Sequence, residues 1–229
     1  MTTLGDLQSR IADDLARADL TNQISAAISD AITHFETTRF YFNEVAASQA
    51  SAPVNGVSTQ VIMTKAGQYL YTGADLAAIP AFFEFDDLFV TINQSRAIPL
   101  RRDDADLLLE LISTVVTQGY PFSWAWMGQG ILLYPIPNNV YPVSLTGAIK
   151  IAPPTDPSDA TNPWITEAFE LVRCYAKGLL YAHVIRDPAS AALMLGEDGD
   201  GGLAGIARAK LERETSSKRA TGRVTPTEF

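Results

Sequence analysis

Residues 161–186 read TNPWITEAFELVRCYAKGLLYAHVIR, and this stretch decides the fold. Asn162 suits the N-cap of a helix, and Pro163 suits the first helical position, where a missing N–H costs nothing. Apolar residues then recur every three or four positions, which predicts one helix of about six to seven turns. Its apolar stripe comprises Ile165, Phe169, Val172, Ala176, Leu179, Leu180 and His183. Asp187-Pro188 ends the helix, because the residue before a proline avoids the α region.

A stripe of this length needs an apolar partner, and the best match lies near the start of the chain. It comprises Leu20, Ile24, Ala27, Ile28, Ala31, Ile32 and Phe35, at the same spacing. We expect these two helices to pack together. A shorter helix from Thr3 to about Ala18 precedes them, and Thr3 followed by Asp6 resembles a capping box with Asp in place of Glu.

Residues 44–160 change to a β-type pattern and are predicted to form an insertion between the paired helices. Short apolar runs bounded by Gly, Pro and Asn indicate antiparallel strands. The predicted strands are 45–51, 57–64, 69–71, 81–92, 95–102, 122–127, 131–134 and 141–151. Pro99 makes the piece around it an edge strand. One helix, about 103–117, is carried by this unit, with Asp103 or Asp104 as its cap.

Two groups of aromatic residues are candidates for tertiary or subunit contacts. Phe40, Tyr41 and Phe42 follow one another at the end of the second helix, so some of them should pack on the next segment or on a neighbouring subunit. Trp124 and Trp126 alternate along a predicted strand and therefore face one side. We expect both groups to contribute to the core or to a subunit or tail interface.

The C-terminal end, residues 196–229, has few large apolar residues. We expect a Gly-rich flexible loop to 202, a short helix from Leu203 to about Ser217, and a polar tail that is mobile until a partner orders it. Its cations and its last residue are the candidates for binding that partner: Arg208, Lys210, Arg213, Lys218, Arg219, Arg223 and Phe229. The predicted fold is therefore α+β, with a helical core formed by 1–43 and 161–195.

The whole chain is acidic, with a formal net charge of −9 over 229 residues. This balance disfavours broad binding to nucleic acid or anionic membranes, because attraction to phosphates needs clustered Lys and Arg. Cys174 is the only cysteine, which excludes an intramolecular disulfide, and its apolar setting favours a buried, inert thiol. The opening residues contain no apolar signal segment and no run is long enough to span a membrane, so we expect synthesis in the cytoplasm.

Catalytic signatures are scarce. His34 and His183 are the two histidines, and neither has a second ligand at helical spacing, so we expect no metal and no cofactor. A metal-dependent hydrolase built on the acidic pairs Asp86-Asp87 and Asp103-Asp104 stays open as an alternative. A carbohydrate- or peptide-binding module that uses Trp124 and Trp126 is another. The balance favours a structural protein that is not an enzyme.

The order of elements resembles the phage head-to-tail adaptor, or connector, proteins of short-tailed phages. The resemblance rests on the Leu-rich first helix, the break at Asp19-Leu-Thr21, the Ile-Ala repeats and the ending Phe-Tyr-Phe-Asn-Glu44. It extends to the segment Gly130–Pro137 with the strand at Tyr141–Leu145, and to the Asn-Pro-Trp helix entry. Residues 1 to about 185 are covered, and the Gly-rich loop at 197–202 has no counterpart that we can place.

This resemblance implies a virion protein of the neck, made in the host cytoplasm. Such adaptors form a dodecameric ring beneath the portal protein and join it to a tail or nozzle protein. The C-terminal segment binds the portal, and the β-rich insertion contacts the tail or the neighbouring subunit. The ring continues the channel for DNA ejection, and DNA passes through it without specific binding. An acidic lumen suits that passage.

Overall fold

The structure of the chain is a computed structural model that describes residues 2–45, 53–54, 57–58, 62–76, 81–92, 96–114, 116–196 and 201–222. It is α+β and divides into two compact units. The helical unit comprises residues 1–43 and 151–229, and the β unit comprises residues 44–150. Residues 151–160 thus belong with the helices, not with the insertion to which the sequence pattern assigned them. The backbone N–H of Gly5 donates to the carbonyl oxygen of Pro157, and this bond holds the segment against the start of the chain.

The first two helices follow the sequence prediction closely. α1 spans Leu4–Leu15, and Thr3 and Asp6 form the predicted capping box, with each side chain accepting from the other's backbone N–H. α2 spans Thr21–Phe35. Its apolar stripe is buried along its whole length, including Leu20 at the N-cap. A short 3-10 turn, η1 at Tyr41–Asn43, closes this part of the unit.

The helix predicted as continuous from 161 to 186 is broken into three pieces. α5 spans Pro163–Thr166, α6 spans Phe169–Leu179, and a π-helix, η2, spans Leu180–Ile185. Asn162 caps α5 as predicted, accepting from the N–H of Trp164. The buried Trp164 indole donates to the carbonyl of Ile151, 3.0 Å away. This bond anchors α5 to the incoming chain. α5 ends at Thr166 and α6 begins at Phe169, with the buried Ala168 as its N-cap.

The predicted packing between the two apolar stripes is confirmed, since α2 and α6 are neighbours in the helical unit. Leu171, Val172, Ala176 and Leu180 are buried against it, whereas Phe169 and Leu179 are half-buried and His183 is exposed. Each fully buried Leu or Ile contributes about 1.5–3 kcal/mol to folding relative to leaving it exposed. The paired stripes therefore form the centre of this unit.

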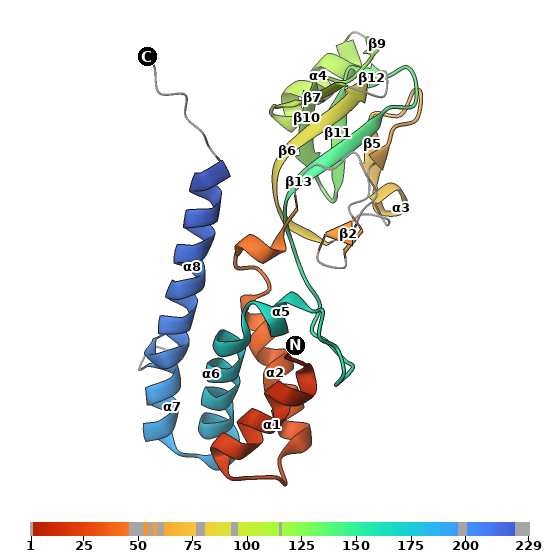
Figure 1. The fold of residues 1–229 in the computed structure, drawn as a ribbon. Coiled ribbons are helices and arrows are strands. Elements are labelled where there is room, and N and C mark those ends of the chain that lie inside the picture. The colour runs from red at the N-terminus through yellow and green to blue at the C-terminus, as the bar shows by residue number, and fades with distance from the viewer. Residues whose placement is uncertain are drawn as a thin grey trace. The chain divides into compact units, whose positions relative to one another are not determined.

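The C-terminal helix expected from Leu203 to about Ser217 is present, but it is longer than expected and packs on the helical unit. α7 spans Pro188–Leu195 and α8 spans Gly202–Gly222, and both pack against α6. Figure 1 shows α8 as one long helix alongside α6 and α7. At Gly178 a Cβ would lie 2.4 Å from Cγ of Leu195, so the close approach of α6 and α7 requires glycine. Ala204, Leu211 and Thr215 supply the buried face that the apolar-poor sequence concealed.

The β unit contains two facing sheets. The first has the order β1-β13-β6-β7 with β4 also on β13, and the second has the order β5-β11-β10-β8. The strands are β1 (Glu44–Val45), β4 (Ile62–Met63), β5 (Leu70–Thr72), β6 (Phe82–Ile92), β7 (Arg96–Pro99), β8 (Arg101–Arg102), β10 (Ser123–Met127), β11 (Gly130–Tyr134) and β13 (Pro142–Ile149). Two small pairs accompany them: β2 (Pro53–Val54) with β3 (Val57–Ser58), and β9 (Gln118–Gly119) with β12 (Ile136–Pro137).

Most strand pairs are antiparallel, as predicted, but β8–β10 and β9–β12 are parallel. Pro99 lies in the edge strand β7, in agreement with the sequence. The chain passes from one sheet to the other at Leu100, whose N–H donates to Leu88 while the next N–H, of Arg101, donates to Phe122. One continuous segment is therefore hydrogen-bonded to both sheets at this edge. The strands of the β unit thus form a curled rather than a flat arrangement.

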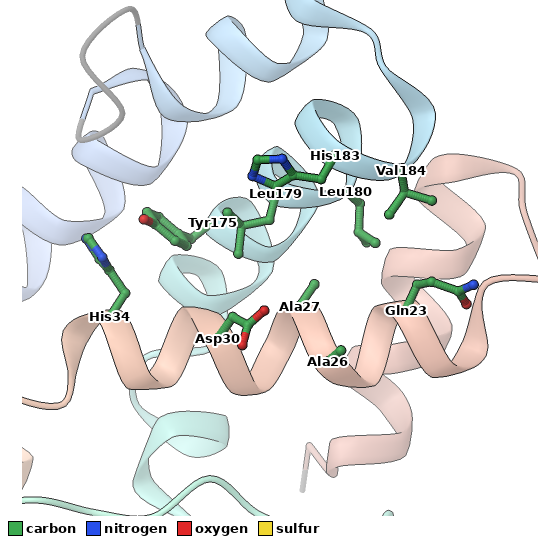
Figure 2. A pocket seen from close by; sticks show the side chains of 10 residues that line it. All are labelled: Gln23, Ala26, Ala27, Asp30, His34, Tyr175, Leu179, Leu180, His183 and Val184. Atoms are coloured by element: carbon green, nitrogen blue, oxygen red, sulfur yellow. The ribbon is translucent and has the colours of Figure 1, made fainter.

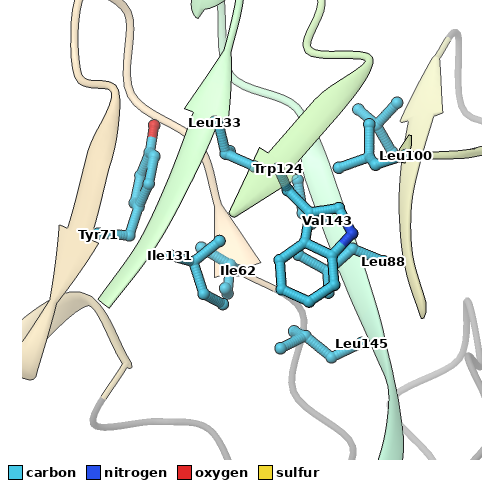
Figure 3. Close-up of a cluster of buried hydrophobic side chains, with 10 residues drawn as sticks. Ile62, Tyr71, Leu88, Leu100, Trp124, Ile131, Leu133, Val143 and Leu145 are labelled. Atoms are coloured by element: carbon cyan, nitrogen blue, oxygen red, sulfur yellow. The ribbon is translucent and has the colours of Figure 1, made fainter. Parts of the chain in front are cut away.

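One apolar core fills the space between the sheets, with Trp124 at its centre (Figure 3). Leu88, Val90, Val143 and Leu145 come from the first sheet, and Ile131 and Leu133 from the second. On the outer side of the second sheet lies α4, a helix at Ala105–Thr114. α4 buries Leu108 against Ala125 and Leu132, while Leu107 and Leu111 remain exposed.

β6 is one long strand that continues through the acidic pair Asp86-Asp87. Asp86 and Asp87 lie opposite the single residue Thr146 in a β-bulge, between the pairs Phe85–Gly147 and Leu88–Leu145. The Thr146 hydroxyl accepts from the N–H of Asp87 and donates to its carbonyl, both at 3.0 Å. A Cβ on Gly147 would lie 2.1 Å from the carbonyl oxygen of Glu84, so this bulged pairing requires glycine.

Candidate assembly surfaces

The predicted basic end is mostly helix α8. Lys210 and Arg213 are exposed on it, and Arg208 forms an ion pair with Glu212 one turn later at 2.8 Å. Arg219 lies in the penultimate turn of α8. Arg223 and Phe229 lie outside the described residues, as does most of the Gly-rich loop. Lys210 and Arg213 are thus carried on a helix that packs against α6.

Tyr41 joins three elements of the helical unit, which the sequence did not predict. Its backbone N–H donates to the Thr215 hydroxyl of α8, and its phenol donates to the Glu167 carboxylate. The Lys218 ammonium lies 3.2 Å from the centroid of its ring, a cation–π contact. Burial and the nearby Glu167 raise the pKa of Tyr41, so its phenol stays protonated at neutral pH. This residue fixes the C-terminal half of α8.

Phe40 and Phe42 are not on a free surface, contrary to one of the two possibilities raised for them. Both are buried, their rings stack at 5.4 Å, and each makes an edge contact with Trp164. The aromatic surplus at the end of α2 is therefore accommodated within the helical unit itself. Trp164 comes 122 residues after Phe42 in the sequence, so no local pattern reveals that these rings pack together.

The two tryptophans of β10 have different environments. Trp124 is 1% exposed and belongs to the core, so it is removed from the candidate interface. Trp126 is 40% exposed, and its ring lies 4.9 Å from that of Phe85, which in turn stacks on Phe82 at 4.9 Å. Phe82 and Phe85 are half-buried. Trp126 with these two rings forms an aromatic patch on the β unit, defined here as residues 82, 85 and 126.

The acidic pairs serve structural roles. Asp104 accepts from the N–H of Asp106 and caps α4, as predicted. Asp103 accepts from Arg101, and that hydrogen bond lowers the pKa of its carboxyl. Asp14 is exposed, and its carboxylate accepts from Arg173 and Lys177 of α6. Asp86 and Asp87 occupy the β-bulge. Across the described residues, no group of three or more His, Cys, Asp or Glu side chains is arranged to hold a metal ion.

Cys174 on α6 is half-buried, and desolvation by burial raises the pKa of its thiol. A thiol with a raised pKa is a poor nucleophile at neutral pH, because the thiolate is the reactive form. This result agrees with the sequence interpretation of an inert side chain. None of the described helices is both long and apolar enough to cross a membrane.

A groove in the helical unit brings the two histidines to one surface. It encloses about 380 Å³ between α2, α6 and η2 (Figure 2). The small side chains Ala26 and Ala27 form its floor on the α2 side, and Leu180 and Val184 lie toward the end at which Gln23 is found. Asp30 and His34 line its polar end, where the His34 imidazole stacks on Tyr175 at 4.6 Å. The remaining lining residues are Gln23, Leu179 and His183.

The sequence pattern did not predict this groove, although it contains one signal for it. Ala26 lies next to the apolar stripe of α2, and small residues there leave room beside the helix that packs on it. The π-helix adds to the space, since one wider turn displaces His183 and Val184 from the positions that an α-helix would give them.

The fold and these surfaces define an α+β interaction protein whose exposed features are a basic helix, an apolar groove and an aromatic patch. Comparison with protein families identifies it more closely. The model of the SU10 adaptor protein family matches residues 2–226, and the chain belongs to this family. The resemblance to phage head-to-tail adaptors is thereby confirmed. No curated protein matches the chain.

Proposed function

We propose that this chain is the structural head-to-tail adaptor of a bacteriophage virion, and that it forms a ring under the portal protein. In this role it joins the portal to the tail or nozzle protein at the neck and continues the DNA channel. The observation that carries the proposal is the family match over residues 2–226, which spans both units. An adaptor role is structural rather than enzymatic.

The basic C-terminal part of α8 is the proposed portal contact. Arg213 is exposed and Lys218 and Arg219 follow it on the same helix, ahead of the segment that contains Arg223 and Phe229. Because the chain as a whole carries a formal charge of −9, a concentration of cations at one end is a distinct surface. Such a surface recognises an acidic partner and orients it through long-range attraction.

The aromatic patch of residues 82, 85 and 126 is the proposed contact of the β unit with a tail protein or a neighbouring subunit. Exposed aromatic rings are typical of protein interfaces, where they bury large apolar areas at small entropic cost. The acidic balance of the rest of the chain suits a channel in which DNA moves without binding, because like charges repel the phosphates.

Light scattering of the purified chain, alone and mixed with its cognate portal, tests the proposal. We expect a complex of ring-sized mass with the portal. The variant Arg213→Glu, shortened to end at Gly222, should bind the portal at least ten-fold more weakly. Arg17→Glu is the matched control, since Arg17 is an exposed cation of the same unit that pairs with Asp19 on the surface. A chain that remains monomeric and ignores the portal would overturn the proposal.

A further inference from the structure

The apolar groove of the helical unit and the outward side of α8 have complementary features. Leu203, Ile206 and Lys210 are spaced three and four residues apart, so they lie on one face of α8. Ile206 is 68% exposed and Leu203 is 40% exposed. This face, called the outer stripe here, is roughly 130° around the helix from the one that buries Leu211 and Thr215 against the unit. Two large apolar side chains followed by a cation therefore point away from their own chain.

The groove shows the matching order on α2. Ala26, which lies between Gln23 and Asp30 in the lining, is four residues before Asp30, just as Ile206 is four residues before Lys210. Four residues correspond to about 6 Å along either helix axis. Val184, 40% exposed, adds apolar surface at the same end as Ala26. A helix laid parallel to α2 thus brings Ile206 to Ala26 and Val184 while Lys210 reaches Asp30.

Charge supports the same pairing. In the described part of the chain, neither Asp30 nor Lys210 has an ion-pair partner of its own, and α2 carries no Lys or Arg between Thr21 and Phe35. Asp30 is exposed at the edge of the groove. An acid next to an apolar floor selects a segment with a cation next to an apolar anchor, since a like charge there would be repelled.

We propose that the groove between α2, α6 and η2 receives the outer stripe of α8 from a second copy of this chain. The inference rests on the proposed ring and identifies its contact. The occupant is a second copy because a chain's own outer stripe faces away from its own groove-forming helices. The two surfaces are different, so the contact is head-to-tail, and repeated contacts of this kind close into a ring when the rotation permits.

A charge exchange tests the contact in the full-length chain with the portal present. Lys210→Asp and Asp30→Lys should each reduce ring formation at least ten-fold, measured as the mass of the complex by light scattering. The double variant, which restores opposite charges, should recover it. Ser216→Asp and Ser29→Lys are matched controls, because both residues are exposed on the same two helices but lie about a quarter turn from the contact.

A cross-link gives a second, independent readout. In a Cys174→Ser background, Ala26→Cys combined with Ile206→Cys should form disulfides between chains on mild oxidation, seen as a ladder of multimers on a non-reducing gel. Either cysteine alone should give none of this ladder. If rings form with the portal while the charge variants have no effect and the cross-link is absent, the inference is wrong and the adaptor function stands. If no ring forms with the wild-type chain, both fail.

Discussion

Asp14 on α1 and Arg173 on α6 are 159 positions apart in the chain, and a carboxylate oxygen of one lies 2.8 Å from a guanidinium nitrogen of the other. Lys177 donates to the same oxygen at 3.0 Å. Each of the three side chains is largely shielded, with 27%, 25% and 12% of Asp14, Arg173 and Lys177 exposed. The start of the chain is thus fixed to its central helix by charge as well as by the apolar stripe.

We predict that Asp14→Asn lowers the free energy of unfolding by about 1 kcal/mol at pH 7, a value between those of exposed and buried ion pairs. Chemical denaturation followed by circular dichroism measures this. Asp13→Asn is the control, since Asp13 is exposed next to it, and it should change the stability by less than about 0.5 kcal/mol. Equal losses in both variants would contradict the role assigned to Asp14.

The same ion pair predicts a pH dependence. Burial alone would raise the pKa of Asp14, but the hydrogen bonds from Arg173 and Lys177 outweigh it and leave that pKa below its ordinary 3.8. A carboxyl whose pKa is lowered by folding stabilises the protein above its unfolded pKa, and this contribution is lost as the pH falls through the folded pKa. The stability difference between wild type and Asp14→Asn should therefore shrink below about pH 4. A difference that is constant from pH 7 to pH 3 would be inconsistent with this account.

Phe40→Ala should destabilise the helical unit rather than weaken assembly selectively. Truncating a fully buried phenylalanine costs about 3–5 kcal/mol, because the ring's contacts are lost and a cavity remains. Urea denaturation of the isolated chain is the measurement. Trp126→Ala in the exposed aromatic patch is the contrast, with an expected loss below about 1.5 kcal/mol. A mild effect of Phe40→Ala would mean that this ring is not in the core.

Gly147→Ala should disrupt the β unit, since a Cβ would lie 2.1 Å from the Glu84 carbonyl oxygen. We expect a loss of about 3 kcal/mol or more, as for other severe steric changes in a sheet core. Gly119→Ala is the control, because a Cβ there meets nothing within 4 Å. Thermal unfolding followed by the fluorescence of the buried Trp124 reports on this unit. The prediction fails if both variants melt at the wild-type temperature.

Tyr41→Ala should loosen the C-terminal half of α8. The variant loses the cation–π contact with Lys218 and the hydrogen bond to Glu167, while the backbone N–H to Thr215 remains. Hydrogen exchange of amides 211–218 should accelerate several-fold, and exchange in α2 should not change. Tyr120→Ala, an exposed residue of the β unit, should leave α8 as it is. Unchanged exchange in α8 would show that Tyr41 does not hold it.

The local patterns of the sequence predicted much of the fold. Caps at Thr3 and Asn162, the helix end before Asp187-Pro188, the stripe of α2, and most strands agree with the structure, because each depends on neighbours a few residues apart. The break at Ala168 could not be read in this way. The apolar period continues through it, so no local pattern marks the change from α5 to α6.

The surfaces were harder to predict than the elements. The clustering of Phe40, Phe42 and Trp164 depends on tertiary packing, and so does the docking of α8, whose buried face is made of small residues and Leu211. The groove lies where two small residues of α2, Ala26 and Ala27, leave space beside α6. A sequence pattern does not show that such a space stays unfilled. The sequence shows which cations the C-terminal helix carries. It does not show that this helix packs against α6 and leaves Lys210 and Arg213 exposed.

The most direct test of the central claim is electron microscopy of the chain mixed with its cognate portal. We predict class averages with a closed ring attached to one end of the portal, coaxial with its channel and absent when the chain is omitted. Portal particles with no added density, at concentrations where the chain is in excess, would contradict the assignment of this protein as a head-to-tail adaptor.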